Sequence, residues 1–229
     1  MLSDFLGLIF PSVCQTCHNP LLTKEELICT VCRYDFPRSN YHLHPQRVDE
    51  AIHYGIPNFG LLLPYLKFVK GGKVQTLLHK LKYGNLPALS SIMGEWYGYD
   101  LVDAGFQGRF DMVIPVPLHQ AKQKKRGYNQ VDGFAQALAN QLDCEVRTDI
   151  LQRITATETQ TKKSRISRFF NVDEVFHVKP SLGEQLSKKR ILLVDDVITT
   201  GATLVSTATV LNEYQPKEIS FGAIAIARH

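Results

Sequence analysis

Strands and helices alternate in the second half of the chain, as the spacing of its apolar residues indicates. The continuous apolar run over residues 191–194 is typical of a strand that is buried on both faces of a parallel sheet. We expect further strands over residues 111–117, 145–147 and 219–227, and helices over residues 131–142 and 202–214. This order predicts an α/β fold, an open and mainly parallel sheet with helices on both faces. In such sheets a ligand binds beyond the carboxyl ends of the strands.

The first half of the chain has a weaker pattern. Apolar side chains recur at helical spacing over residues 74–81, and Gly84 is expected to end this helix. A second helix is expected over residues 88–100, although two glycines interrupt it, and the apolar run over residues 60–66 predicts a strand or a packed extended segment. His79 is expected at the surface of this helix, and the alternative is that it contacts a ligand. Three more polar residues lie on or beside the helix: Lys80, Lys82 and Tyr83.

The composition is that of a soluble globular protein. Its 229 residues, of which 44% are hydrophobic and 21% charged, allow one ordinary domain with a small appendage. No apolar stretch approaches the roughly 20 residues that a membrane-spanning helix needs. The first ten residues contain Asp4 and lack a basic leader, so they predict a short packing helix rather than a signal peptide. The chain is therefore expected to be cytoplasmic.

Four of the five cysteines are arranged in two closely spaced pairs. Cys14 and Cys17 form one C-x2-C pair, and Cys29 and Cys32 form the other after eleven residues. Two such turns can complete a tetrahedral thiolate site, and reduced thiols in a cytoplasmic chain favour zinc over disulfides. Because all four ligands are thiolates, the zinc is expected to be structural rather than catalytic. The alternative is that these are unrelated free cysteines.

Other residues that could bind a metal are given simpler roles. His18, His42 and His44 lie near the cysteines and are expected at the surface, since four cysteines already complete a tetrahedron. Cys144 stands alone after a predicted helix and is expected to be a buried small hydrophobe.

A strand, two carboxylates and a hydroxyl-rich turn follow one another near the C-terminus. The predicted strand delivers Asp195 and Asp196 at its carboxyl end, and the turn over residues 199–203 then opens a helix. A helix N-terminus offers unpaired N–H groups and positive dipole, and Gly201 lets a phosphate approach the backbone. The carboxylates can accept hydrogen bonds from sugar hydroxyls. The simpler interpretation is a buried strand ending in acids, followed by a threonine N-cap.

This stretch, Ile191-Leu-Leu-Val-Asp-Asp-Val-Ile-Thr-Thr-Gly-Ala-Thr203, closely resembles the motif by which type I phosphoribosyltransferases bind phosphoribosyl pyrophosphate (PRPP). The resemblance implies that Asp195 and Asp196 bind the ribose hydroxyls. It also implies magnesium, bound mainly by oxygens of PRPP itself. The residues expected to bind the 5-phosphate are Thr199, Thr200, Gly201, Ala202 and Thr203.

Other motifs are similar to those of the ComF family of competence-associated proteins, which also begin with a four-cysteine zinc knuckle. The motifs are Leu77-Leu-His-Lys-Leu-Lys-Tyr-Gly84, Pro115-Val-Pro-Leu-His119, Lys125-Arg-Gly-Tyr-Asn-Gln130 and Arg153-x3-Thr157-x2-Gln160-Thr161-x6-Arg168-x2-Asn171. The resemblance covers nearly the whole chain. It implies three parts: a zinc-binding knuckle over residues 1–40, a linker and helical hood-like segment over 41–104, and a phosphoribosyltransferase-like domain over 105–229.

Two basic segments lie where the phosphoribosyltransferase plan has a loop that cradles pyrophosphate and a flexible loop that closes over PRPP. After the first strand of the sheet, Lys124, Lys125 and Arg126 are candidates for binding pyrophosphate, and Gly127 permits a tight turn; the alternative is a solvated surface. Residues 128–130 are expected to start a helix and line a groove. The segment over residues 155–168 is expected to close over PRPP, or to be a disordered connector. Its candidate closing contacts are Gln160, Thr161, Lys162 and Arg168.

Two functions remain open. The family resemblance implies a PRPP-binding protein of DNA uptake and natural transformation that handles single-stranded DNA, with DNA-uptake machinery such as a ComF helicase-type protein as partner. The alternative is an active phosphoribosyltransferase, a glycosyltransferase that moves ribose 5-phosphate from PRPP to an unidentified base or amine and releases pyrophosphate. Any hood that selects an acceptor is expected from about residues 45–100. The net charge of +4 is too small to establish a nucleic-acid partner by itself.

Overall fold

The computed structural model describes residues 12–45, 56–155 and 174–227. The packing helix expected over the first ten residues lies outside the described residues, as does most of the segment expected to close over the ligand.

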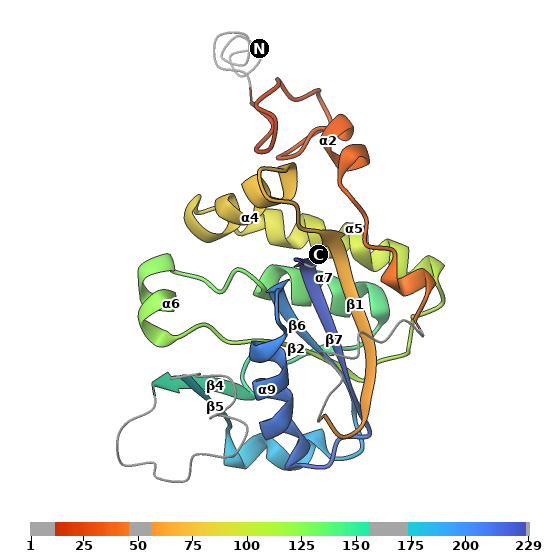
Figure 1. Cartoon of the computed structure of the whole chain (residues 1–229), viewed down its shortest axis with the longest axis vertical. Coiled ribbons are helices and arrows are strands. Elements are labelled where there is room, and N and C mark those ends of the chain that lie inside the picture. Colours follow the sequence, from red (N-terminus) through yellow and green to blue (C-terminus); the bar gives the residue numbers. More distant parts are fainter. Residues whose placement is uncertain (1–11, 46–55, 156–173, 228–229) are drawn as a thin grey trace.

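A five-stranded sheet forms the centre of the molecule (Figure 1). Its strands are β1 (Phe59–Lys67), β7 (Glu218–Ile226), β6 (Arg190–Ile198), β2 (Met112–Pro115) and β3 (Glu145–Val146), in that spatial order. Every neighbouring pair is parallel. The predicted parallel α/β sheet is therefore confirmed, and the apolar run at residues 60–66 is one of its strands.

Apolar clusters cover both faces of this sheet. One face packs against α4 (Lys73–Tyr83), α5 (Ala88–Asp103) and α7 (Asp132–Leu142). The other packs against α9 (Ala202–Asn212), the 3-10 helix η2 (Pro180–Leu186) and the antiparallel pair β4 (Leu151–Thr155) and β5 (Glu174–Val178). Strand β6 shows why its sequence is continuously apolar: Ile191 and Leu193 belong to the second cluster, whereas Leu192 and Val194 belong to the first.

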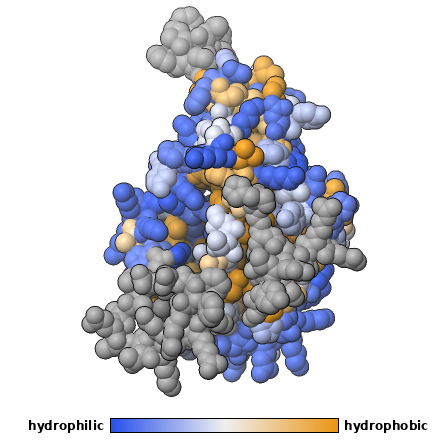
Figure 2. Space-filling view, viewed as in Figure 1, coloured by the Kyte–Doolittle hydropathy of each residue, from blue (hydrophilic) through white to orange (hydrophobic). Residues whose placement is uncertain are grey.

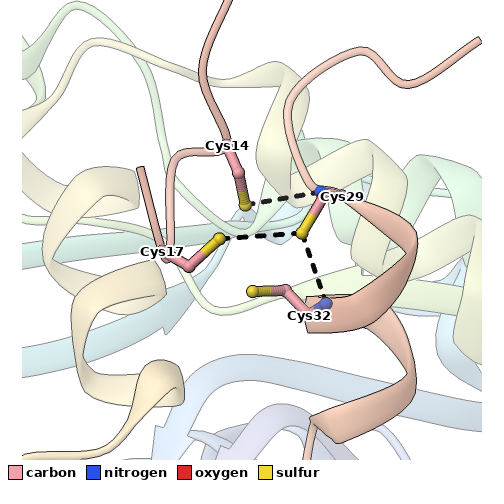
Figure 3. Close-up of side chains that lie close together, drawn as sticks. All are labelled: Cys14, Cys17, Cys29 and Cys32. Carbon is pink, nitrogen blue, oxygen red and sulfur yellow. Dashed lines mark hydrogen bonds between the residues drawn. The ribbon is translucent and has the colours of Figure 1, made fainter. Parts of the chain in front are cut away.

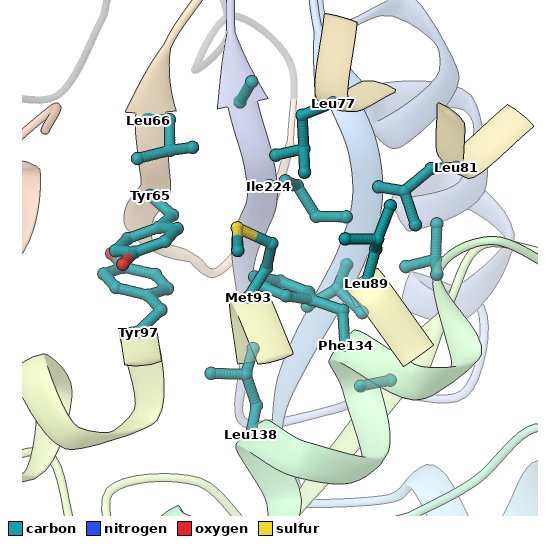
Figure 4. Packing of buried hydrophobic residues seen from close by; sticks show 14 of the residues in the cluster. Tyr65, Leu66, Leu77, Leu81, Leu89, Met93, Tyr97, Phe134, Leu138 and Ile224 are labelled. Atoms are coloured by element: carbon teal, nitrogen blue, oxygen red, sulfur yellow. The ribbon is translucent and has the colours of Figure 1, made fainter. Parts of the chain in front are cut away.

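Helices α5 and α7 cross at close range, and a glycine makes this possible. A Cβ on Gly94 would lie 2.7 Å from the carbonyl oxygen of Phe134 and 2.7 Å from Cβ of Ala137. The neighbouring rings of Tyr97 and Phe134 stack at 6.4 Å, and Figure 4 shows Met93 and Leu89 of α5 directed toward Phe134 and Leu138 of α7. The glycine that weakened the helix prediction is thus a packing residue.

Three local expectations need correction or refinement. His42, expected at the surface, is buried in η1 (Tyr41–Leu43), with its ring edge-on to Tyr97 at 5.6 Å. Strand β6 does not end at the carboxylates but continues to Ile198, because it pairs with β7 as far as Ile226. Cys144, expected to be buried, is only partly buried against the apolar cluster beneath α4, α5 and α7. Its burial, and to a smaller extent the charges of Asp111 and Asp143, raise the pKa of its thiol to about 12.

The N-terminal knuckle packs against helices α4 and α5, which cover one face of the sheet. Its helix α2 (Thr30–Asp35) places Arg33 over the ring of Trp96 at 4.6 Å, and Asp35 forms a 2.8 Å ion pair with Lys73. The division of the chain at residues 41 and 105 stays a prediction; β1, from within the middle segment, is part of the main sheet.

Hydrophilic residues cover much of the face seen in Figure 2, including the region over α6 (Gln120–Arg126). In the described part of the chain, no helix combines the length and the apolar character that crossing a membrane requires.

Candidate functional site

The predicted phosphate loop connects the end of β6 to the start of α9. Gly201 adopts φ 78°, a left-handed conformation that favours glycine, and its carbonyl accepts the first helical hydrogen bond from Val205 at 2.9 Å. The hydroxyl oxygen of Thr200 accepts from the backbone N–H of Ala202 at 3.3 Å. The N-terminus of α9 therefore lies at a solvent-open depression. Its lining residues are Asp195, Val197, Ile198, Thr199, Thr200, Gly201, Ala202, Thr203 and Leu204.

Asp196 is a buried carboxylate held by two side chains from distant segments. It is 7% exposed. Its Oδ2 atom accepts a 2.7 Å hydrogen bond from Nε2 of Gln130 and lies 3.0 Å from Nζ of Lys82. A cation and an amide donor together offset the cost of burying this charge.

Asp195 has a different environment from its neighbour. Its Oδ1 atom accepts a 2.8 Å hydrogen bond from the backbone N–H of Asp196. Burial first, and then the charge of Asp196, raise its pKa to about 7, against the opposing influence of Lys82 and Arg153. A carboxylate in this position gains from any further hydrogen-bond donor, and sugar hydroxyls are such donors.

A small network joins this pair to the ends of α4 and α6. Arg126, at the end of α6, donates a hydrogen bond to Oε1 of Gln130, and its guanidinium lies 5.7 Å from the centre of the Tyr83 ring. The hydroxyl of Tyr128 donates to the carbonyl of Leu81 at 2.6 Å. The C-terminal turn of α4 is thereby fixed beside the carboxylates.

The pyrophosphate candidates do not all lie in one place. The segment forms helix α6, which buries none of its residues, and Gly127 ends it with φ 83°. Lys124 and Lys125 are exposed there, whereas Arg126 reaches the carboxylate network through Gln130. The closing contacts Gln160, Thr161, Lys162 and Arg168 lie outside the described residues.

Lys82 and Gln130 were not predicted as residues of this site. Helical periodicity marks Lys82 only as a polar position on or beside a helix, and Gln130 was expected to start a helix and line a groove, without a role at the carboxylates. Both residues lie in motifs that resemble those of the ComF family, Leu77–Gly84 and Lys125–Gln130, and these motifs are the sequence signal that could have identified them. Lys82 and Gln130 lie on different segments and meet at one oxygen of Asp196, and periodicity in either segment cannot show this.

The four predicted cysteine ligands come together in the knuckle (Figure 3). Their sulfur atoms all lie within 4.8 Å of one another, and the sulfurs of Cys17 and Cys29 are 3.7 Å apart. Zinc–sulfur bonds of about 2.3 Å in a tetrahedron require sulfur–sulfur distances of about 3.8 Å. The cluster therefore has the residues and the dimensions of a tetrahedral metal site.

The cysteines of this cluster differ in acidity. Burial raises the pKa of Cys14, but backbone hydrogen bonds from Cys29, Cys17 and Thr16 outweigh this and lower it to about 6. Burial and the neighbouring sulfurs raise the pKa of Cys29 and Cys32 above the ordinary value. All four sulfurs would be thiolates together only with a cation between them, whose charge favours the deprotonated form.

Comparison with known proteins agrees with this geometry. The phosphoribosyl transferase domain family matches residues 133–229, a region that contains β6, the phosphate loop and α9. DNA utilization protein YhgH of Escherichia coli O157:H7 is 30% identical over 216 residues, which cover 89% of this chain and 92% of that protein.

Two competence proteins are also similar over shorter stretches. Competence protein F of Haemophilus influenzae is 38% identical over 117 residues, and the alignment spans about half of each protein, 51% in both cases. Competence protein ComFC of Bacillus subtilis is 32% identical over 102 residues, which cover 44% of this chain and 38% of that protein.

Among solved structures, a hypoxanthine phosphoribosyltransferase from Staphylococcus aureus matches with a TM-score of 0.35 and 16% identity. The match covers 58% of this chain and 60% of that one. A score this low does not bear on fold or function.

Proposed function

This chain belongs to the ComF family, and from that premise we propose that it binds PRPP and handles single-stranded DNA during DNA uptake in natural transformation. Its partners would be single-stranded DNA and DNA-uptake machinery such as a ComF helicase-type protein. This work would take place in the cytoplasm.

The observation that supports PRPP binding is the continuity of the two carboxylates with the phosphate loop. Asp195 and Asp196 lie a few residues before a turn in which Gly201 adopts φ 78° and α9 begins. The N–H groups of such a turn suit a phosphate dianion, while carboxylates suit ribose hydroxyls. One ligand with both groups in this order is a ribose 5-phosphate, and PRPP contains it. Magnesium would be carried mainly by the oxygens of PRPP itself.

Calorimetric titration with PRPP in magnesium tests this proposal. The Asp195→Asn/Asp196→Asn double variant nearly preserves shape and removes the charge, so PRPP affinity should fall while the fold survives. Each lost hydrogen bond to a charged group should cost about ten- to a hundredfold in affinity. Gly201→Val should also weaken binding, because a β-branched residue is strained at this φ and crowds the phosphate.

Cys144→Ala serves as the control and should bind PRPP as the wild type does, because Cys144 lies outside the site. A folded double variant that binds PRPP with wild-type affinity would defeat the proposal. A wild type without measurable PRPP affinity would leave DNA handling as the surviving function.

An active phosphoribosyltransferase is the second candidate, and the cations beside the carboxylates favour it. Lys82 forms an ion pair with Asp196, and Arg126 is connected to the same carboxylate through Gln130. In the transfer, a nucleophilic nitrogen would form a bond to C1 of the ribose while the bond from C1 to pyrophosphate breaks. The bonding electrons would leave with pyrophosphate, whose charge these cations could offset. Release of pyrophosphate from PRPP with a panel of bases and amines would establish this activity.

Zinc is the metal that we propose for the cysteine cluster, with Cys14, Cys17, Cys29 and Cys32 as its ligands. Four thiolates leave no position for water, so the zinc would hold the knuckle and take no part in chemistry. The knuckle (1–40), the hood-like segment (41–104) and the phosphoribosyltransferase-like domain (105–229) are proposed as the three parts of the chain.

A further inference from the structure

One oxygen of the carboxylate pair already has two close partners in this structure, an amide donor and an ammonium group. Oδ2 of Asp196 accepts from Nε2 of Gln130 at 2.7 Å and lies 3.0 Å from Nζ of Lys82. The amide hydrogen bond uses one lone pair of this oxygen, and the ammonium group of the ion pair lies next to it. A ribose hydroxyl that approaches this oxygen must therefore compete with these partners.

Lys82 is the donor that can move. Gln130 is 5% exposed, and its other amide atom, Oε1, accepts from Arg126, so both ends of this side chain are held. The side chain of Lys82 is 31% exposed and flexible. The backbone beneath it is fixed, because Leu81 is fully buried and its carbonyl accepts from Tyr128. The ammonium group can leave Asp196 without any movement of α4.

The chemistry of PRPP indicates where a displaced ammonium would go. Its pyrophosphate is attached to C1 of the ribose, next to the 2-hydroxyl group that would donate to the carboxylates. A cation that yields to the ribose hydroxyls therefore lies beside the pyrophosphate. Ribose 5-phosphate carries a neutral hydroxyl at C1, so a displaced ammonium would find no anionic partner there.

We propose that Lys82 exchanges Asp196 for the pyrophosphate of PRPP and thereby makes the site prefer PRPP over ribose 5-phosphate. This inference rests on the proposed PRPP-binding function. In this view Lys82 determines specificity. Moving its ammonium group away from Asp196 costs one ion pair, and only a ligand with a pyrophosphate replaces it.

The test compares the affinities of PRPP and ribose 5-phosphate for the full chain in magnesium. Lys82→Met removes the charge at nearly constant length, and Lys82→Gln also retains a donor for Asp196, which protects the fold if the methionine variant is unstable. Both should weaken PRPP binding by about ten- to a hundredfold and change ribose 5-phosphate binding much less. The preference for PRPP should therefore fall about tenfold or more.

Two further variants serve as controls. Lys82→Arg keeps the charge and should retain the preference, and Lys80→Met, in the same turn of α4, should change neither affinity. Equal losses for the two ligands would mean that Lys82 acts only by holding Asp196, and unchanged affinities would remove it from the site; either result overturns the inference. If the wild type binds neither ligand, the proposed function itself fails, and the inference fails with it.

Discussion

At the scale of single residues, the two neighbouring carboxylates differ because their surroundings differ. Asp196 is buried with an ammonium and an amide donor at one oxygen, whereas Asp195 accepts from the backbone and lies beside the charge of Asp196. The pKa of Asp195 is accordingly raised to about 7, well above its ordinary value of 3.8. One of the pair is thus poised to change its charge near neutral pH.

This raised pKa predicts a pH dependence of stability. Between about pH 4 and 7 the folded protein binds more protons at Asp195 than the unfolded chain, so its contribution to the free energy of unfolding falls as pH rises. The slope for one proton is at most about 1.4 kcal/mol per pH unit. Asp195→Asn should therefore gain stability relative to the wild type as pH rises through this window. Urea denaturation of both proteins from pH 4 to 8 measures the difference, and parallel curves would contradict it.

At the scale of elements, tertiary packing decided features that local patterns left open. Helix α5 contains two glycines, and Gly94 is one that the contact with α7 requires. The basic segment after β2 forms helix α6, ended by Gly127, where a loop was expected. No residue of α6 is buried, and its lysines are exposed. An extended polyanion could therefore bind along this helix, and solvent alone could also surround it.

The close contact at Gly94 predicts an unusual sign for a glycine-to-alanine change. Helix propensity alone would make Gly94→Ala stabilising by about 1 kcal/mol. The added Cβ would meet the backbone of Phe134, so we expect a net loss of stability, since overpacking costs about 1–3 kcal/mol. Thermal or urea denaturation gives the result. Glu95→Ala, at the exposed neighbouring position, is the control and should stay within about 0.5 kcal/mol of the wild type.

Helix α6 predicts how single-stranded DNA would be bound. Lys124→Glu/Lys125→Glu should weaken DNA binding and make it less dependent on salt, by about 0.7 in the log–log slope for each lost phosphate contact. Stability should not change, because both side chains are exposed. Lys189→Glu/Lys217→Glu alters the net charge equally at the amino ends of β6 and β7 and should retain binding. Equal effects of the two pairs on DNA affinity would show that net charge, not α6, determines binding.

At the scale of the whole molecule, the knuckle and the sheet share one hydrophobic core. Cys14, Cys29 and Cys32 belong to the same buried cluster as Leu77 of α4 and Leu89 of α5. Helix α4 in turn supplies Lys82 to the carboxylate site. The three sequence segments are therefore connected through α4, from the cysteine cluster to the candidate ligand site.

Metal removal tests this connection. Purified protein should contain about one zinc per chain. Chelation should lower the melting temperature and increase hydrogen exchange in residues 12–39 and along α4 and α5, while the cluster beneath α9 stays protected. Cys32→Ser should behave like the chelated protein, and Cys144→Ser should keep the metal. Protein expressed with adequate zinc that holds no stoichiometric metal would refute the assignment.

The sequence by itself determined what depends on neighbours along the chain. The apolar patterns predicted the strands of the central sheet, the spacing of the cysteines predicted their cluster, and the order of residues 191–203 predicted the turn at Gly201, because each feature is local. The antiparallel pair β4 and β5 was not predicted. Tertiary structure decided what depends on contacts between distant segments. Gln130 and Asp196 are 66 residues apart, Lys82 reaches the same oxygen from α4, and His42 is buried by Tyr97. Such contacts follow from how the helices pack on the sheet, and periodicity within one segment carries no information about its partner across the core.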